Sequence, residues 1–504
     1  MTRTSFPIAL AVTLGTAWLA AAAVNDPVRL DAGQVSGTAG STPEMRIYKG
    51  IPYAAPPVGN LRWRAPQPAP HWDGVRKAEA LGSPCLPNMR GSEDCLYLNV
   101  WTAAKSASEK HPVMVWIYGG GFNTGSASQP DYDGGNLAKK GVVVVTFNYR
   151  LGPFGFFSHP ELTKESDRGA SGNQGLMDMV AALQWVQKNI AAFGGDPRKV
   201  TIFGESAGSM AVADLMASPQ AKGLFIRAIG ESGGLMGLSI GRMRSLVDSE
   251  QAGVKAAETL GAKSLAELRA QPAEAIQKAA RGAGAIVDGW FLPVDTDTAF
   301  LQGKQNAVPV LVGSNKDEGT FFLQPTTADK FREQAQRRFG DLADSFLRIY
   351  PAGSDEEANA SALRAFADEA GWMMRTWARD EVKTGKTKAY LYFFTHEPPA
   401  TPGRGRGGRG RGATHVAEVP YVFQNQNNRP WTDVDHQLSD TMSSYWVNFA
   451  TNGDPNGKGL PKWPAFDENK NPAPIVLGDT VEAGPAPDAA KLNFYQAVYD
   501  KEKR

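Results

Sequence analysis

The chain has 504 residues, of which 42% are hydrophobic and 21% charged, and its formal net charge is +1. This is an ordinary globular composition with ample apolar surface for a core, in one large domain or in two to three smaller ones. The near-zero charge gives no reason to expect nucleic acid or an anionic membrane surface as a partner.

The N-terminus has the pattern of a secretory signal. Arg3 precedes an apolar run, Phe6 to Ala23, that ends in four alanines. A buried helix or a membrane anchor is the alternative, and Pro7 with the small alanines argues against a firm anchor. We therefore expect a signal peptide over residues 1–23, cleavage near Ala23, and a secreted or periplasmic protein. No later stretch approaches about 20 unbroken apolar residues, so no stable membrane anchor is expected.

The chain has two cysteines, Cys85 and Cys95. In an exported protein, such a close pair predicts a disulfide, and two free thiols are the alternative. Two cysteines without neighbouring histidines make a poor zinc site.

Several short β-branched runs are apolar on both faces, as strands of a covered parallel sheet must be. Helical patterns lie between them, most clearly from Asn173 to Phe193, where Gly194 and Pro197 end the helix. This alternation predicts an α/β fold with right-handed crossovers. The runs are Val113–Tyr118, Val142–Tyr149, Val200–Phe203 and Val308–Gly313.

Three glycines, Gly119 to Gly121, follow the first of these runs. Glycines let the backbone approach a substrate closely, and tetrahedral intermediates need preorganised N–H donors. The run matches the HGGG-type motif of lipases and esterases, with Tyr118 in place of histidine. A flexible loop is the alternative interpretation.

The pentapeptide Gly204–Gly208 reads Gly-Glu-Ser-Ala-Gly and lies between a strand pattern and a helix pattern, Met210 to Met216. On such a tight, strained turn, side chains at the flanking positions would clash, so glycine is needed on both sides. The helix start aims its dipole and free N–H groups at a developing oxyanion. We therefore predict that Ser206 is a nucleophile, with an ordinary glycine-rich turn as the alternative.

Two long stretches, residues 240–285 and 325–385, have helical composition. The first lies between core strands, so we interpret it as a helical insertion beside the functional site. The one low-complexity segment is Gly403–Gly412, in which glycines alternate with arginines. It is either a solvated, mobile insertion or a basic rim that draws anionic esters to the site. The arginines are Arg404, Arg406, Arg409 and Arg411.

Several long motifs, in the same order along the chain, resemble the type-B carboxylesterase family, which includes cholinesterases and broad-range bacterial esterases. The resemblance runs from about Val28 to Tyr499. It implies an α/β-hydrolase fold, with a mostly parallel sheet covered by helices on both faces, as a single domain over residues 24–504. The motifs are Ser92–Trp101, Tyr118–Phe122, Phe147–Gly152, Asn173–Asp178 and Phe203–Gly208.

The resemblance also implies several site residues. The oxyanion donors would be the N–H groups of Gly120, Gly121 and Ala207. The catalytic acid would be Glu318, and Asp317 is its rival because the sequence does not show which carboxylate points inward. Cys85 and Cys95 would correspond to the family's first disulfide.

The catalytic base must follow the acid in the chain order of this fold. Of the six histidines, this leaves His396, His415 and His436. His396 follows an apolar strand and can be structural, and His436 lies in a polar stretch. His415 lies in a segment similar to the family's catalytic-histidine segment, so we predict that it is the base.

The expected chemistry is hydrolysis of small-molecule carboxylic esters through an acyl-enzyme, with no metal or organic cofactor. His415 would take the proton of Ser206, and Glu318 would orient and stabilise the imidazolium. Glu205 would favour the charged histidine or be a buried structural carboxylate. Ser232 resembles a supporting serine of the family.

Two other functions remain open. A non-catalytic cholinesterase-like binding protein would lack triad residues, and an acylglycerol lipase would be activated at an oil–water interface. Choline esters are not expected, because residues 86–94 contain no aromatic side chain. Nucleic-acid binding by the arginine–glycine run is not expected in an exported, neutral protein. The oligomeric state is not predicted.

Four aromatic residues either line an acyl pocket or belong to the core: Trp290, Phe291, Phe321 and Phe322.

Overall fold

The computed structural model describes residues 24–400 and 412–503. The expected signal peptide, residues 1–23, and the arginine–glycine run as far as residue 411 lie outside the described residues. Within the described ranges, no helix has both the length and the apolar character needed to cross a membrane.

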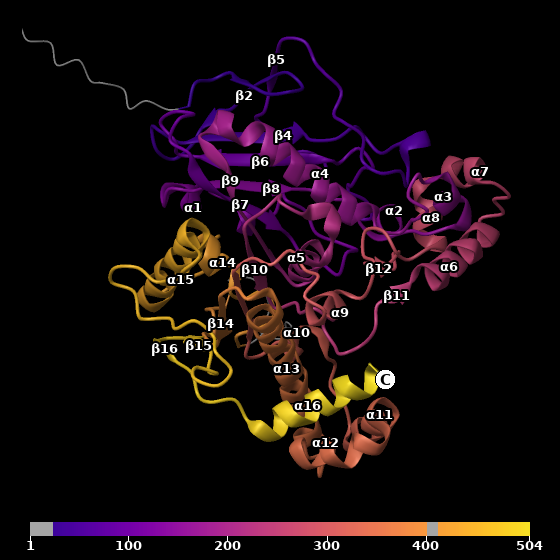
Figure 1. Cartoon of the computed structure of the whole chain (residues 1–504), viewed down its shortest axis with the longest axis vertical. Helices are drawn as coiled ribbons and strands as arrows, with labels where there is room; N and C mark the ends of the chain where they lie inside the picture. The colour runs from indigo at the N-terminus through magenta and orange to yellow at the C-terminus, as the bar shows by residue number, and fades with distance from the viewer. Residues whose placement is uncertain (1–23, 401–411, 504) are drawn as a thin grey trace, which may run out of the picture.

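An eleven-stranded sheet forms the centre of the molecule (Figure 1). Its strands, in spatial order, are β16 (Val481–Ala483), β15 (Ile475–Leu477), β14 (Ala389–Phe394), β13 (Val310–Asn315), β10 (Arg227–Glu231), β9 (Gly195–Glu205), β7 (His111–Ile117), β8 (Val143–Phe147), β6 (Tyr97–Thr102), β4 (Arg46–Pro52) and β3 (Thr38–Ala39). Neighbouring strands from β15 to β8 are parallel, and the pairs at both edges are antiparallel. The predicted α/β-hydrolase fold is therefore confirmed.

The four runs predicted as strands correspond to β7, β8, β9 and β13, and nearly all residues of β7, β8 and β13 are buried. One boundary differs. The predicted run Val308–Gly313 is shifted by two residues, because β13 begins at Val310 and extends to Asn315. Pro309 has no N–H to donate to a strand ladder, so the regular pairing starts after it.

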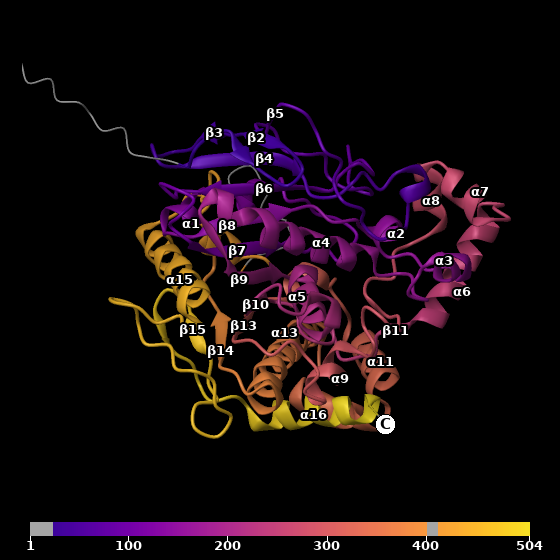
Figure 2. The same ribbon diagram turned by 45° about the horizontal axis from the view of Figure 1, so that its top comes forward.

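Helices cover both faces of the sheet. In both views, α1 (Gly135–Lys139) and α15 (Asp433–Asn452) lie on one side, and α4 (Gln174–Asn189), α5 (Ala207–Ala217) and α13 (Asp355–Asp380) lie on the other (Figures 1 and 2). The helix predicted over residues 173–193 is α4 followed by a 3-10 turn, and Gly194 ends it in the left-handed conformation, with φ 80°.

The segment between β10 and β13 forms a group of helices at one end of the molecule, next to α3 (Pro160–Glu165) (Figure 1). It contains α6 (Leu246–Thr259), α7 (Leu265–Ala270) and α8 (Ala273–Ala279), and the short parallel strands β11 (Arg244–Ser245) and β12 (Ile286–Val287) flank it. A separate apolar cluster around Trp63 and Phe157 holds this group. The sequence predicted helix throughout, but Gly261 and Pro272 interrupt it, because neither residue favours a helix interior.

The second helical stretch, between β13 and β14, contains α11 (Ala328–Phe339), α12 (Ala343–Ile349) and α13. These helices pack with α16 (Ala489–Glu502) around their own aromatic cluster, which includes Phe346 and Phe494. The remaining strands and α-helices are a three-stranded sheet of β1 (Val28–Arg29), β2 (Gln34–Ser36) and β5 (Val75–Lys77), and the short helices α2 (Gly152–Gly155), α9 (Thr296–Leu301), α10 (Gly319–Phe322) and α14 (Val419–Phe423).

The predicted disulfide between Cys85 and Cys95 is present. The loop that it closes supports the glycine run, because the amide of Asn88 donates to the carbonyl of Gly125 at 2.7 Å and accepts from the hydroxyl of Thr124 at 2.9 Å. A buried ion pair joins two of the motifs found in the sequence, with a guanidinium nitrogen of Arg150 2.7 Å from a carboxylate oxygen of Asp178.

Candidate active site

Ser206 lies at the sharp turn between β9 and α5, with φ 56° and ψ −124°. A residue with a side chain rarely adopts this conformation, so the backbone is strained here. The flanking glycines permit the turn. A Cβ on Gly208 would lie 1.9 Å from the carbonyl oxygen of Ile117, and one on Gly204 would lie 2.6 Å from Gly208. Both clashes account for the Gly-x-Ser-x-Gly spacing.

The glycine run after β7 lies directly against this turn. A Cβ on Gly119 would be 2.8 Å from the Cβ of Ser206. In the described part of the chain, the N–H groups of Gly120, Gly121 and Ala207 donate to no acceptor. Unpaired N–H donors held beside a serine are what a developing oxyanion requires. Tyr118, which directly precedes the glycine run, stacks on Tyr149 with ring centroids 4.5 Å apart.

His415 is buried, with 1% of its surface exposed, and its Nδ1 lies 2.6 Å from Oε2 of Glu318. Glu318 directly follows the turn after β13, where its Oε1 accepts the N–H of Asn315 at 2.9 Å. The rival carboxylate, Asp317, instead accepts the N–H of Ala413 at 2.8 Å. Of the two carboxylates that the sequence left open, Glu318 is the one that contacts the histidine.

The second nitrogen of His415 faces the residue before the serine. Its Nε2 lies 3.1 Å from Oε1 of Glu205, but the two groups are not aligned for a hydrogen bond. Among the described residues, Ser206 and His415 form no hydrogen bond in this structure. The structure therefore brings Glu318, His415 and Glu205 into contact and leaves Nε2 without a hydrogen-bond partner.

Neither of the other two candidate histidines contacts these residues. His396 hydrogen-bonds through both ring nitrogens to Asp435 and Asp479. His436 is exposed and packs against Trp431, with ring centroids 5.5 Å apart.

Two further buried carboxylates, Glu418 and Glu231, interact electrostatically with the groups of this cluster, and no sequence motif assigned either of them to the site. Glu418 accepts a short hydrogen bond from the amide of Asn315. Glu231 accepts from the indole N–H of Trp446 at 2.8 Å, and its backbone carbonyl accepts the N–H of Ser206 at 2.8 Å. The position of Glu418, three residues after His415, was the only sequence signal. Ser232 is buried beside Glu231, and its hydroxyl has no partner among the described residues.

Burial and the close approach of these carboxyl groups shift their own pKa values and that of His415. Burial raises the pKa of Glu205 and Glu231 well above the usual range, and it raises that of Glu418 to about 7. Burial alone would lower the pKa of His415, but the charges of Glu205 and Glu318 outweigh it and raise the value to about 9. The cluster therefore increases the proton affinity of His415.

The four aromatic residues singled out in the sequence divide into two pairs. The rings of Phe321 and Phe322 lie 5.5 Å and 4.6 Å from the ring of His415, and Phe321 is 44% exposed. Phe291 is buried in the main core, and Trp290 stacks under the guanidinium of Arg168. Only the first pair borders the histidine.

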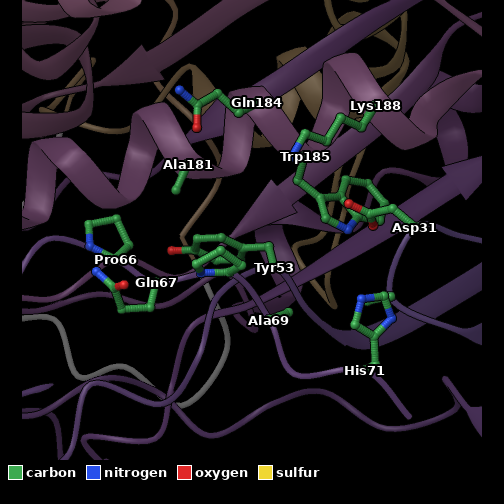
Figure 3. Close-up of a pocket in the computed structure, with 12 residues that line it drawn as sticks. Asp31, Tyr53, Pro66, Gln67, Ala69, His71, Ala181, Gln184, Trp185 and Lys188 are labelled. Atoms are coloured by element: carbon green, nitrogen blue, oxygen red, sulfur yellow. The ribbon is translucent and has the colours of Figure 1, made fainter. Parts of the chain in front are cut away.

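A cavity of about 240 Å³ lies away from these groups, between the N-terminal segment and α4 (Figure 3). Tyr53 and Trp185 line it together with Asp31, His71 and Lys188. None of the candidate catalytic residues reaches it. Over the described ranges, no group of three or more histidine, cysteine, aspartate or glutamate side chains is arranged to hold a metal ion.

Comparisons with known proteins identify the family of the chain. The model of the "Carboxylesterase family" matches residues 25–494. The chain is 39% identical to a fumonisin B1 esterase of Sphingopyxis macrogoltabida, over 93% of this chain and 90% of that protein. It is 36% identical to the para-nitrobenzyl esterase of Bacillus subtilis, over 92% of this chain and 97% of that protein.

Solved structures give the same result. The chain superposes on a PNB esterase with a TM-score of 0.79 and 34% identity, covering 93% of this chain and 99% of the other. It superposes on the carboxylesterase EST55 of Geobacillus stearothermophilus with a TM-score of 0.79 and 32% identity, with the same coverage. The chain therefore belongs to the carboxylesterase family.

Proposed function

We propose that this chain is a serine carboxylesterase that hydrolyses small-molecule carboxylic esters through an acyl-enzyme on Ser206. One observation carries the proposal: a serine on a strained strand-to-helix turn lies beside three unpaired N–H donors, from Gly120, Gly121 and Ala207. That combination fits acyl transfer, in which negative charge develops on the carbonyl oxygen as the serine attacks.

In the first half of the reaction, Nε2 of His415 takes the proton of the Ser206 hydroxyl while Oγ bonds to the ester carbonyl carbon. The carbonyl electrons move to the oxygen, which the three N–H groups stabilise. When the intermediate collapses, the carbon–oxygen bond to the alcohol breaks, and the imidazolium protonates the departing alkoxide. Water then attacks the acyl-enzyme by the same route and releases the acid and the free serine. No metal or organic cofactor is needed.

Two carboxylates support the base in this scheme. Glu318 holds the proton on Nδ1 through the 2.6 Å contact, so that Nε2, which has no hydrogen-bond partner among the described residues, is the nitrogen that takes the serine proton. Glu205, 3.1 Å from Nε2, stabilises the positive charge that the ring gains in the transition state.

The alternatives are less well supported. A non-catalytic binding protein has no need of a strained serine beside free N–H donors, and the named relatives are esterases and hydrolases. An acylglycerol lipase would be activated by an oil–water interface. We also propose that residues 24–504 form one domain that is exported after removal of residues 1–23. The disulfide between Cys85 and Cys95 supports export, because disulfides persist in oxidising compartments.

The test is hydrolysis of p-nitrophenyl esters from acetate to palmitate by the wild type and by Ser206→Ala. The panel includes fumonisin B1 and a p-nitrobenzyl ester, for which two relatives are named. We expect turnover by the wild type that is lost in the variant, with preference for short chains. Equal turnover by a folded Ser206→Ala protein would disprove the assignment, and activation by emulsified long-chain esters would favour the lipase.

A further inference from the structure

A second cavity, of about 320 Å³, lies in the helical group between β10 and β13. Phe156, Phe157 and alanines of α6 and α8 form the apolar part of its walls, and polar side chains line the rest. Three cations from three different elements line it: Arg244 on β11, Lys255 on α6 and Arg281 after α8. We call it the basic cavity.

The charges of the basic cavity are not neutralised. Its lining contains no aspartate or glutamate. Arg244, Lys255 and Arg281 form no ion pair within residues 24–400 and 412–503. The cavity in Figure 3, by contrast, carries both Asp31 and Lys188. A concave surface that carries charges of one sign concentrates anions.

A buried hydroxyl points to the same ligand chemistry. Ser249 on α6 lines the basic cavity, is 3% exposed, and its Oγ has no hydrogen-bond partner in the described part of the chain. A buried polar group without a partner is costly, and its presence in a native protein calls for an explanation. A carboxylate oxygen in the cavity would accept the hydrogen bond that this hydroxyl can donate.

A pair of phenylalanines links the basic cavity to the candidate oxyanion donors. Phe156, in its wall, packs on Phe122 with ring centroids 4.9 Å apart, and Phe122 directly follows Gly121. The N–H of Ala283, another lining residue, donates to the carbonyl of Phe156 at 3.1 Å. A Cβ on Gly121 would meet no atom within 4 Å, so the outer side of the glycine run is open.

We infer that the basic cavity binds a carboxylate of the substrate, and that the enzyme prefers esters that carry a free carboxylate on the acid or the alcohol part. This inference rests on the proposed esterase function. The basic cavity differs from a basic rim formed by Arg404 to Arg411, because the cations of the cavity belong to the insertion between β10 and β13.

The experiment compares matched pairs of esters. Mono-p-nitrophenyl glutarate and p-nitrophenyl valerate differ by a carboxylate on the acid part, and 4-acetoxybenzoate and its methyl ester differ by one on the alcohol part. The test variant combines Arg244→Gln, Lys255→Gln and Arg281→Gln. The control combines Lys222→Gln, Lys304→Gln and Lys462→Gln, which removes the same charge from exposed lysines outside the cavity.

We expect the anionic-to-neutral ratio of kcat/KM to fall roughly tenfold in the test variant for at least one pair, because each exposed cation contributes a factor of roughly two to five. The pair that responds identifies the part of the ester that bears the carboxylate. Neutral esters and the control variant should change less than twofold. In the wild type, 1 M NaCl should reduce the preference, since salt screens exposed charges.

A second readout does not depend on turnover. Glutarate should raise the melting temperature of the wild type and not that of the test variant. Ser249→Ala should reduce the glutarate-induced shift. An unchanged ratio for both pairs in the test variant, or an equal glutarate shift in the wild type and the test variant, would overturn the inference. So would loss of the preference on deletion of residues 404–411 alone. Failure of the wild type to hydrolyse the neutral esters would instead refute the proposed function.

Discussion

His396 and His415 are both buried, and each lies between two carboxylates, but their ring nitrogens are used differently. Both nitrogens of His396 are hydrogen-bonded, Nδ1 to Asp479 at 2.7 Å and Nε2 to Asp435 at 2.9 Å. His415 forms one such bond, from Nδ1 to Glu318, and its Nε2 has no aligned partner.

The difference shows what distinguishes a structural histidine from a candidate base. Asp435 also accepts hydrogen bonds from Tyr421 and Thr432, so His396 belongs to a closed network that ties the start of α15 to the chain after β14. A base needs one nitrogen ready to accept a proton, at a place where a substrate can arrive. Of these two histidines, His415 is the one with a nitrogen that has no aligned partner among the described residues, and it lies beside Glu205 at the turn that carries Ser206.

The largest expected effect comes from replacing each histidine in turn. His415→Ala should lower kcat/KM for p-nitrophenyl acetate by at least about 10⁴-fold without loss of folding, because it removes the base. His396→Ala should reduce the melting temperature and leave kcat/KM of the folded protein within a few fold. Steady-state kinetics and thermal melts on both variants check this. A similar loss of activity in both would end the distinction between the two histidines.

The two neighbouring carboxylates after β13 give the next contrast. Glu318→Gln should lower kcat by about 10³- to 10⁴-fold, because the neutral amide no longer stabilises the imidazolium. Asp317→Asn should have a small effect, since Asp317 contacts the backbone of Ala413 and not the histidine. If the aspartate variant were the more damaged of the two, the acid would have to be reassigned.

Replacement of Glu205 tests the charge around the base. Its carboxylate raises the pKa of His415, so Glu205→Gln should move the acid limb of the kcat/KM–pH profile to lower pH. The plateau should also fall, roughly tenfold, because the transition-state imidazolium loses a negative neighbour. An unmoved profile would show that Glu205 is a structural carboxylate.

The stability contributed by the His415 network should fall as the pH rises, and the stability contributed by the His396 network should fall as the pH drops. The pKa of His415 is raised from 6.5 to about 9, so its contribution to stability is present below pH 6.5 and is lost as the pH rises through 9. Burial acts to raise the pKa of Asp435, but its hydrogen bonds, led by that from Thr432, lower it from 3.8 to about 2. Its contribution is present above pH 3.8 and is lost as the pH falls through 2.

Denaturation midpoints measured from pH 2 to pH 10 check this smallest effect. Compared with the wild type, Glu318→Gln should flatten the alkaline side of the curve, and Asp435→Asn should flatten the acid side. Identical changes on both sides in the two variants would contradict the separate roles.

Sequence reasoning found the parts of the site that are encoded locally. Ser206 and its flanking glycines form one strained turn, so their spacing is visible in the chain. Glu318 and Asp317 are neighbours, and no sequence pattern can decide which of two adjacent carboxylates contacts a histidine that lies 97 positions later. The choice between the two carboxylates is made by the packing of the chain after β13 against the segment around His415.

The remaining groups come together through tertiary structure alone. Asn315, Glu231 and Glu418 lie at the ends of β13 and β10 and at the start of α14, and no spacing between them marks a common site. The cations of the basic cavity are equally scattered, and in the sequence they look like the solvated side chains of a helical segment. Gly261 and Pro272 interrupt the helix in that segment, and the resulting turns bring the three cations to one cavity.

The most direct test of the account is labelling with diethyl p-nitrophenyl phosphate, followed by peptide mass spectrometry. We expect loss of activity to track a single adduct on the peptide that contains Ser206, with much slower labelling in His415→Ala and wild-type labelling in His396→Ala. Inactivation with the adduct on another residue, or equal labelling rates in the two histidine variants, would contradict the proposal that His415 activates Ser206.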